Sequence, residues 1–537
     1  MVNFAFKGGL SLRGPIRRRT VVGKVSRQGA LVLSPGKRGW YAPLIVAVAS
    51  IFLSVVAVGQ QSDPAAAPPA ESILASFLAS FENALAEAIA KAEGSVVAIA
   101  RVPRRRANES TVLEFRPDPF GRRLAPFIPS SPSDPDYVPS EYGAGVIVDR
   151  AGRILTAYHV LGEDSDQYDY FVTVADRRTL PATPLAADPR SDLAVLQVPA
   201  DNLQPIQLGD AKSLQKGHFV IALGNPFAIA RDGQASASWG IVANLQRKAP
   251  PRFPSSESGG KPTLHHFGTL IQTDAKLNWG TSGGALINLK GEMVGLLTAL
   301  PAVAGYEQAA GYAYPVDDMF RRALEALLQG REVEYGFLGV SPINLTPEET
   351  LRGGLGARVD RIVPGTPAEF CGLRPGDVVV SINGTPVYDA DSLVLEVGRL
   401  PVESRVRIEF VRDGRTRQIE AVLTKYPVRG KKIITTPPPT WRGVRVDYAS
   451  VALDSETGLT LLSPIREGGV LVTEVARNSA AWQAGLRPGM LVLRVESQAV
   501  TTPRQFFELV ANKSREVKLA VRDRPGGSLS ELRVPPP

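Results

Sequence analysis

The sequence is poor in the side chains that build disulfides and metal sites. Only one of its 537 residues is a cysteine, Cys371, so no disulfide can form within the chain. Only four are histidines, and the adjacent pair His265 and His266 has no cysteine or carboxylate cluster beside it in the sequence. Metal sites need several such ligands at regular spacing, so we expect no metal.

Acidic residues are absent from residues 1–39, which contain nine lysines and arginines. The net charge of the whole chain is +8, so this segment accounts for the entire positive excess. A nucleic-acid-binding domain usually has a basic face of its own. The remainder of the chain has no such excess, and we therefore expect no nucleic-acid partner.

Charge of either sign is absent from residues 40–59, which are long enough to cross a hydrocarbon core of ~30 Å. Basic residues ahead of such a segment predict that the N-terminus stays in the cytoplasm and the rest is translocated. The segment is thus expected to be a membrane anchor. A signal peptide cleaved after Gly59 is the alternative, because small residues precede that position.

Three residues far apart in the sequence have the types needed for nucleophilic catalysis. Ser282 lies in the glycine-rich segment 280–284, His159 follows the strand-like residues 154–157, and Asp192 opens an apolar run. A serine hydroxyl attacks a carbonyl only when a base takes its proton and a carboxylate orients that base. The chain order His, Asp, Ser is that of chymotrypsin-type proteases.

The glycines around Ser282 fit the same chemistry. The attack creates an oxyanion, which needs preorganised backbone N–H donors. Gly280 can adopt the backbone angles that turn its N–H inward, and Ser282 supplies a second N–H. Each feature also has an ordinary interpretation: a small-residue turn for 280–284, a structural histidine, and a turn aspartate.

Several collinear segments resemble the HtrA (DegP-like) family of trypsin-fold serine proteases. They are residues 143–149, 154–160, 192–196, 222–227, 240–242, 271–275, 280–286 and 311–316. The resemblance implies a mostly β protein with a double β-barrel. It also implies an ATP-independent serine endopeptidase that uses His159, Asp192 and Ser282 and no cofactor.

The chain departs from the family pattern beside the nucleophile, where Trp279 and Thr281 are unusual, and at Tyr158 before the histidine. The segments 101–140 and 246–267 are also long or unusual in composition. In this family such loops switch the active site between disordered and ordered forms. A chaperone or peptide-binding scaffold with little cleavage is therefore the alternative function. The apolar residues 296–299 favour cleavage after small aliphatic residues.

The C-terminal third contains an internal repeat. Residues 363–377 recur as residues 476–490, with a shared Ala-x-x-x-Gly-Leu-Arg-Pro-Gly core. This core is similar to a signature of bacterial-type PDZ domains, which bind a peptide as an added strand and hold its carboxylate in a glycine-containing loop. Met490 replaces the aspartate of the first copy, and residues 447–463 are inserted in the second.

The expected peptide-binding residues are Phe337, Leu338, Gly339 and Val340 in the first copy and Gly443 in the second.

The chain divides into a basic N-terminus (1–39), an anchor or signal segment (40–59), a Pro/Ala linker (60–70), a protease domain (71–330), a first PDZ domain (331–426), a Pro-rich linker (427–440) and a second PDZ domain (441–537). Residues 71–93 have helical spacing of apolar residues. That helix could support trimer contacts or simply pack on the barrel.

The resemblance also implies a location and partners. We expect a single-pass protein of the bacterial inner membrane with its catalytic and PDZ domains in the periplasm, or release to the periplasm after cleavage. Its substrates would be misfolded or unfolded envelope proteins, recognised partly by C-terminal peptides. A homotrimer or larger homo-oligomer is expected.

Overall fold

The computed structural model describes residues 70–104, 139, 141–225, 233–249, 263–298, 311–452, 468–523 and 527–537. The predicted anchor at 40–59 lies outside these residues. Most of the loop 101–140 and of the insertion 447–463 also lie outside them, as do residues 250–262 and Ala299. In the described part of the chain, no helix combines the length and apolarity needed to cross a membrane.

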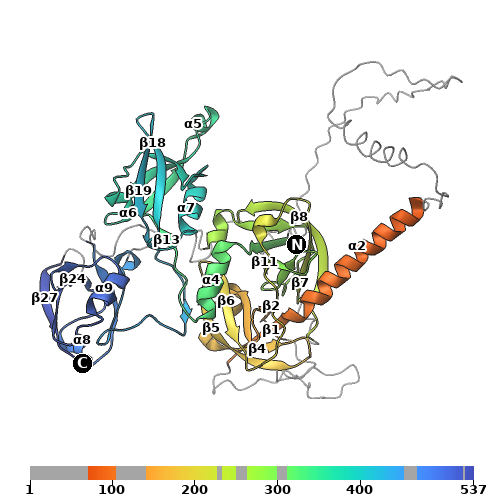
Figure 1. Ribbon diagram of the computed structural model, residues 1–537, viewed down its shortest axis with the longest axis horizontal. Coiled ribbons are helices and arrows are strands. Elements are labelled where there is room, and N and C mark those ends of the chain that lie inside the picture. Colours follow the sequence, from red (N-terminus) through yellow and green to blue (C-terminus); the bar gives the residue numbers. More distant parts are fainter. Residues whose placement is uncertain are drawn as a thin grey trace, which may run out of the picture. The chain divides into compact units, whose positions relative to one another are not determined.

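A long helix precedes the first barrel. Helix α2 (Ala70–Ala92) corresponds to the helix expected at 71–93, and it leads through a short 3-10 turn into β1 (Figure 1). Its C-terminal end is buried at Ala88 and Ala92, whereas Phe77 and Leu78 are exposed. Only its last turns therefore pack into the protein core.

The first barrel contains the region of His159 and Asp192. Its strands are β1 (Val96–Pro103), β2 (Glu141–Ile147), β3 (Arg153–Ala157), β4 (Tyr168–Thr173), β5 (Thr179–Asp188) and β6 (Leu193–Gln197). They pair antiparallel in the order β5-β4-β1-β2-β3-β6, and β6 pairs with β5 to close the barrel. Helix α3 (Tyr158–Leu161) begins directly after β3.

The second barrel contains the region of Ser282. Its strands are β7 (Phe219–Gly224), β8 (Ser236–Arg247), β9 (Leu270–Thr273), β10 (Ala285–Ile287), β11 (Met293–Thr298) and β12 (Gly311–Pro315). They close in the order β10-β11-β12-β9-β8-β7. The two barrels confirm the double-barrel fold expected from the sequence.

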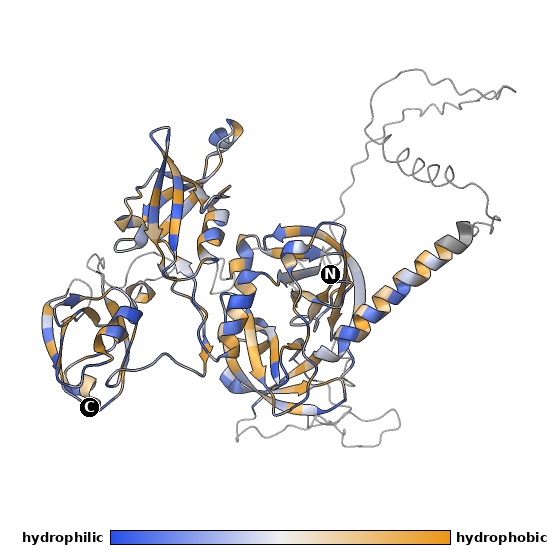
Figure 2. Ribbon diagram, viewed as in Figure 1, coloured by the Kyte–Doolittle hydropathy of each residue, from blue (hydrophilic) through white to orange (hydrophobic). Residues whose placement is uncertain are grey.

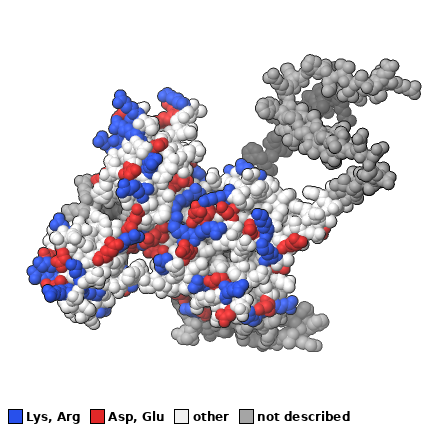
Figure 3. All heavy atoms as spheres, in the orientation of Figure 1, with Lys and Arg blue, Asp and Glu red and all other residues white. Residues whose placement is uncertain are grey.

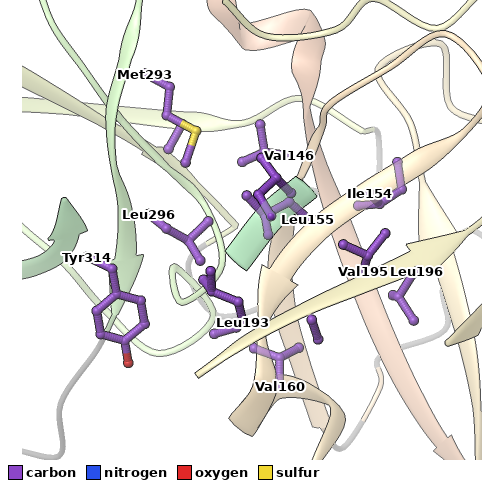
Figure 4. Packing of buried hydrophobic residues seen from close by; sticks show 14 of the residues in the cluster. Val146, Ile154, Leu155, Val160, Leu193, Val195, Leu196, Met293, Leu296 and Tyr314 are labelled. Carbon is purple, nitrogen blue, oxygen red and sulfur yellow. The ribbon is translucent and has the colours of Figure 1, made fainter. Parts of the chain in front are cut away.

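One continuous hydrophobic core joins the barrels. Figure 4 shows Met293, Leu296 and Tyr314 of the second barrel beside Val146, Leu155 and Leu193 of the first. All six side chains are at least 97% buried. The strand ends that flank this core are thereby fixed relative to each other, which is what a site shared by the two barrels requires.

Helix α4 (Asp318–Leu328) follows the last strand of the second barrel. It begins at Asp317, whose carboxylate accepts a hydrogen bond from the amide of Phe320 at 2.9 Å and so caps the helix. Its apolar face, including Phe320 and Leu324, is buried in the core that joins the barrels. The chain then enters the C-terminal domains.

The two C-terminal repeats form domains of the same topology. The first sheet has the order β14-β15-β16-β18-β19 and the second the order β22-β23-β24-β26-β27, with one short extra strand on the third strand of each. Strand irregularities also recur, at 341/342 and 379/381 in the first sheet and at 445/446 and 492/494 in the second. This agrees with two PDZ domains, and Figure 2 shows the alternation of polar and apolar residues along their strands.

The first of these domains contains β13 (Gly336–Phe337), β14 (Val340–Asn344), β15 (Ala357–Ile362), β16 (Val378–Ile382), β17 (Thr385–Pro386), β18 (Arg405–Arg412), β19 (Arg415–Val422) and β20 (Thr424–Lys425). Its helices are α5 (Pro347–Leu351), α6 (Pro367–Phe370) and α7 (Ala390–Gly398). The second contains β22 (Val444–Tyr448), β23 (Val470–Val475), β24 (Leu491–Val495), β25 (Gln498–Ala499), β26 (Val517–Arg522) and β27 (Leu529–Val534), with α8 (Ala480–Gln483) and α9 (Pro503–Val510).

The segment between the two domains contributes a strand to the first barrel. Strand β21 (Ile433–Ile434) pairs antiparallel with β5, with Ile433 opposite Ala187. Thr435 adds a hydrogen bond from its hydroxyl to the carbonyl of Leu185 at 2.8 Å. The residues that the sequence suggests as a linker are thus partly incorporated into the sheet.

On the face shown in Figure 3, basic and acidic side chains are interspersed. The nine positive charges of residues 1–39 lie outside the described residues.

Candidate active site

Strand pairing brings the histidine and the aspartate together. Strands β3 and β6 are neighbours, and Ala157 at the end of one lies opposite Leu193 at the start of the other. The next residues out, Tyr158 and Asp192, continue this ladder through a hydrogen bond from the Tyr158 amide to the Asp192 carbonyl at 2.9 Å. His159 therefore leaves its strand directly beside Asp192.

Asp192 binds His159 through both carboxylate oxygens. Its Oδ1 accepts the backbone amide of His159 at 3.0 Å, and its Oδ2 lies 2.7 Å from His159 Nδ1. The His159 side chain is 36% exposed and that of Asp192 only 10%. The Nδ1 edge of the imidazole ring is thus fixed by a buried carboxylate, while the ring still reaches solvent, as a general base requires.

Asp192 keeps its charge despite its burial. Burial by itself raises the pKa of the carboxyl, but the charge of His159 and the hydrogen bonds from His159 and Tyr314 outweigh it, so the pKa lies below its ordinary value. The backbone of Asp192 is also unusual, with φ of +55°. Aspartate tolerates this conformation better than most residues.

Ser282 lies in a turn that packs closely on the first barrel. Its carbonyl accepts the amide of Ala144 in β2 at 2.8 Å. Gly283 has φ of +84°, and a Cβ there would lie 2.1 Å from the carbonyl oxygen of Ala144 and 2.4 Å from Thr156 Oγ1. Only glycine fits this contact. Since Thr156 lies three residues before His159, the turn is held close to the histidine.

Gly143 makes a second close contact between the elements that carry His159 and Ser282. A Cβ at Gly143 would be 2.7 Å from a methyl carbon of Val160 and 3.3 Å from the carbonyl oxygen of Ser282. Val160 directly follows His159. The structure therefore brings all three sequence-predicted residues, His159, Asp192 and Ser282, to one site between the barrels.

Gly280 has the conformation that the sequence suggested. Its φ is +93°, and a Cβ would lie 2.3 Å from the carbonyl oxygen of Asn225 and 2.7 Å from the ring of Tyr142. Within the described ranges, its amide donates to no acceptor. This N–H is consequently available for a ligand.

The two unusual neighbours of Ser282 have different surroundings. The side chain of Trp279 is 73% exposed. Thr281 is buried, and both its amide and its hydroxyl donate to the carbonyl of Asn278, at 3.1 and 2.7 Å. Thr281 therefore closes the turn before Ser282, and Trp279 lies on the outside of that turn.

Tyr314 is a site residue that sequence reasoning missed. This tyrosine of β12 is buried, and its hydroxyl donates a short hydrogen bond to Asp192 Oδ2. His265, in the 3-10 helix η5 (Leu264–Phe267), stacks on the Tyr314 ring with centroids 3.8 Å apart. Both His265 and the adjacent His266 are buried. The remaining histidine, His218, is exposed.

A second buried carboxylate supports the same loop. Asp188 accepts hydrogen bonds from the amide and the hydroxyl of Ser191, both at 2.7 Å, and a short one from the hydroxyl of Tyr335. Burial raises its pKa. The loop from Asp188 to Asp192 is thereby held at both ends. The contact between Tyr335 and Asp188 could not be predicted from the sequence.

The predicted carboxylate loop of the first PDZ domain lies at a sheet edge. Leu338 is buried, and its carbonyl accepts the amide of Ala368 at 2.9 Å. Gly339 has φ of +87°, and a Cβ there would lie 2.0 Å from Thr366 Oγ1. Val340 then begins β14, the edge strand of the sheet. Phe337 pairs in β13 and contacts the ring of Tyr426 edge-on at 5.7 Å.

The second domain repeats this arrangement. Gly443 has φ of +87°, and a Cβ would lie 2.3 Å from the side chain of Ser479. Its carbonyl accepts the amide of Ala476 at 2.8 Å, as that of Gly339 accepts the amide of Val363. At the position of Met490, the sulfur accepts the amide of Arg487 at 3.3 Å. The two loops have equivalent hydrogen bonding despite their different sequences.

No group of three or more His, Cys, Asp or Glu side chains that could hold a metal ion occurs in the part of the chain that the structure describes.

Comparison with known families gives three matches. A trypsin-like peptidase domain matches residues 143–296, and PDZ domains match residues 336–423 and 471–523.

Curated relatives of the chain are bacterial proteases. A probable periplasmic serine endoprotease, DegP-like, of Chlamydia trachomatis serovar D is 32% identical over 381 residues, which are 70% of each chain. The corresponding protein of Chlamydia pneumoniae is 29% identical over 497 residues, 89% of this chain and 94% of that one. A solved structure of the HtrA-type protease AlgW with a tripeptide is 26% identical, covers 64% of this chain and 97% of its own, and has a TM-score of 0.48.

Proposed function

This chain belongs to the DegP-like serine endoproteases, and we propose that Ser282, His159 and Asp192 are its catalytic triad. The chain is a serine endopeptidase, as its relatives are. The observation that carries the assignment is the two-point binding of His159 by Asp192, at 3.0 and 2.7 Å, in the site that also contains Ser282. The carboxylate fixes the tautomer with the proton on Nδ1, which leaves Nε2 as the base.

The reaction proceeds in two halves. Ser282 Oγ attacks the scissile carbonyl while His159 Nε2 takes the hydroxyl proton, and Asp192 stabilises the resulting imidazolium. The imidazolium then protonates the leaving amine as the C–N bond breaks, which leaves an acyl-enzyme on Ser282. A water molecule, deprotonated by His159, releases the second product and restores the serine hydroxyl.

The amides of Gly280 and Ser282 are proposed as the oxyanion hole. The left-handed conformation of Gly280 supports this role, as does its amide, which has no acceptor among the described residues. The hydrogen bonds of Thr281 to Asn278 also favour an ordered turn over a collapsed one. Both observations favour an active enzyme over a non-cleaving chaperone.

The decisive experiment compares degradation of unfolded casein by the wild type and by Ser282→Ala. We expect cleavage by the wild type and its complete loss in the variant, which keeps the fold and the peptide-binding domains. Absence of cleavage by both proteins, with C-terminal peptides added, would instead support the chaperone or scaffold function.

The proposed substrates are misfolded or unfolded envelope proteins in the periplasm. The periplasmic proteases among the relatives support the location. Substrate tails would bind as an added strand on β14 and β22, with the terminal carboxylate at the loops of Leu338 and Gly339 and of Gly443. A fluorescent C-terminal peptide should bind the full-length protein and be released by an unlabelled peptide with the same carboxylate but not by its amide.

Cleavage after small aliphatic residues is the proposed specificity. Strand β11 is apolar and buried at Leu296 and Leu297, and the sequence there offers no acidic residue to bind a Lys or Arg side chain. A peptide library should therefore be cut after Val or Ala, and cleavage after Lys or Arg would contradict this proposal.

A homotrimer or larger homo-oligomer, tethered through residues 40–59, completes the proposal. An aromatic cluster on α2 and the second barrel supports self-association: Phe219 and Trp239 are 39% and 56% exposed, and the Phe81 ring lies 5.0 Å from that of Phe219. Light scattering should show that the wild type is an oligomer and that Trp239→Lys dissociates it. The control Leu529→Lys, at an exposed leucine of the last strand, should leave the oligomer intact.

N-terminal sequencing of the mature protein distinguishes an anchored form from one cleaved after Gly59.

A further inference from the structure

The carboxylate of Asp192 has a partner besides the histidine. Its Oδ2 accepts two hydrogen bonds, one from His159 Nδ1 at 2.7 Å and a short one from the hydroxyl of Tyr314. Asp192 belongs to the first barrel and Tyr314 to β12 of the second. The phenol therefore joins the two barrels at the same oxygen atom that orients the base.

The Tyr314 hydroxyl is itself fixed in position. Thr298 Oγ1, on the neighbouring strand β11, lies 3.1 Å from it, and the tyrosine is 97% buried. A buried hydroxyl that reaches a carboxylate forms a charge-assisted hydrogen bond, which is stronger than a neutral one. The hydroxyl is consequently a strong constraint on where Oδ2 can lie.

His265 holds the other side of this arrangement. Its ring stacks on that of Tyr314, at 3.8 Å between centroids and an interplanar angle of 11°. Its Nε2 lies 2.8 Å from the carbonyl oxygen of Ser191, the residue before Asp192, and its Nδ1 lies 2.6 Å from Thr269 Oγ1. A carbonyl can only accept, so Nε2 bears the proton and Nδ1 accepts from the threonine.

The neutral state of His265 is consistent with this geometry. Burial lowers its pKa to about 4, so the ring is uncharged at neutral pH. An uncharged ring can stack on Tyr314 without placing a second positive charge next to Asp192. His159 then remains the partner that neutralises the carboxylate.

We propose that Tyr314 is a positioning residue for the triad, which fixes Asp192 Oδ2 against His159, and that His265 holds both the Tyr314 ring and the Ser191 backbone in place. This inference rests on the proposed function, because it assigns roles relative to His159 as the base. Neither residue touches the substrate, so both act only through Asp192.

The test measures kcat and KM of Tyr314→Phe across pH. Loss of the hydroxyl leaves Asp192 less well oriented, and we expect kcat to fall about tenfold with KM changed less than about twofold. The hydroxyl also withdraws charge from Oδ2. Without it the protonated form of His159 is favoured, so the acid limb of the kcat/KM profile should move upward by about 0.3 to 1 pH unit.

The matched control is Tyr312→Phe, two residues away on the same strand, whose hydroxyl has no hydrogen-bond partner in the described ranges. It should retain wild-type kinetics. A Tyr314→Phe enzyme with kcat within twofold of wild type, or with reduced kcat and an unmoved acid limb, would overturn the positioning role. If Tyr314→Phe does not fold, His265→Gln replaces it with the same readouts, because the glutamine amide can still donate to Ser191 while the stacked ring is lost.

The outcomes separate this inference from the proposed function. If the wild type and Ser282→Ala are equally inactive, the catalytic assignment itself fails. If the wild type is active and Tyr314→Phe matches it at every pH, only the role of Tyr314 fails.

Discussion

At the scale of single residues, the site depends on a few backbone conformations that only particular side chains allow. Asp192, Gly280 and Gly283 all have positive φ, at +55°, +93° and +84°. The two glycines also approach backbone atoms so closely that no Cβ would fit. The sequence predicted a serine site here because these backbone conformations require glycine, and the required glycines stand at fixed positions around Ser282.

Gly280→Ala should strongly reduce catalysis. The added methyl would meet the carbonyl oxygen of Asn225 at 2.3 Å, so the peptide must rotate and its N–H leaves the oxyanion position. We expect kcat to fall by about 10² to 10³, with KM little changed, in a steady-state peptide assay.

Gly217→Ala is the control for this substitution. Gly217, in the turn before β7, has a similar φ of +91° but nothing within 4 Å of a Cβ. Equal losses in the two variants would mean that backbone strain alone, and not the oxyanion hole, explains the effect.

His265 should make stability depend on pH. Its pKa is about 4 in the folded protein and near the ordinary 6.5 when unfolded, so the unfolded state binds more protons between these values. Stability is therefore full above about pH 6.5 and falls as the pH drops toward 4, by about 2 kcal/mol at pH 5. Thermal unfolding at pH 7 and 5 should show a smaller loss for His265→Gln; an identical loss would assign the effect to other groups.

At the scale of elements, residue spacing predicted the helix at 71–93 and the internal repeat predicted two similar domains, but neither predicted the contacts between distant segments. Helix α2 follows from the spacing of its apolar residues, and the two matching PDZ sheets follow from the repeat. The pairing of β21 with β5 could not be predicted in this way, because β21 is only two isoleucines in a Pro-rich segment and is too short to show a periodic pattern. The role of Tyr314 could not be predicted either, because a tyrosine within an apolar strand looks like an ordinary core residue.

The glycine of the first PDZ loop should be essential for peptide binding. In Gly339→Ala the methyl would lie 2.0 to 2.6 Å from Thr366, so the loop must open. We expect the affinity for a C-terminal peptide at the first PDZ domain to fall at least tenfold, measured by fluorescence anisotropy in a protein whose second loop carries Gly443→Ala. Gly414→Ala, in the β18–β19 turn with open space around it, should bind normally. Unchanged binding by Gly339→Ala would remove the assignment of this loop.

At the scale of the whole molecule, a buried lysine links the start and the last strand of the first PDZ domain to the second PDZ domain. Lys425 is 3% exposed and forms ion pairs with Glu332 and Asp447, both at 2.8 Å, and with Glu334 at 3.3 Å. Burial alone lowers the pKa of Lys425, but the three carboxylates outweigh it and raise the pKa above its ordinary value. Glu332 lies just before β13 at the start of the first PDZ domain, and Asp447 belongs to β22 of the second.

Lys425→Met should destabilise this junction. It leaves Glu332 and Asp447, whose side chains are 11% and 22% exposed, without their shared cation. Removing one partner of a buried ion pair typically costs about 3 to 5 kcal/mol. Calorimetry should show a lower thermal midpoint, and limited proteolysis should cut faster between the PDZ domains. Lys518→Met, which removes an exposed pair 3.7 Å from Glu531, should have almost no effect. Equal behaviour of the two variants would contradict a structural role for the network.

The central claim is that Ser282 is a nucleophile activated by His159 in the full-length protein. The most direct measurement is peptide mapping by mass spectrometry after reaction with a fluorophosphonate. We predict one adduct per chain, on Ser282, that is absent from Ser282→Ala and forms far more slowly in His159→Ala. An adduct elsewhere, or labelling of Ser282 at the same rate without His159, would contradict the account.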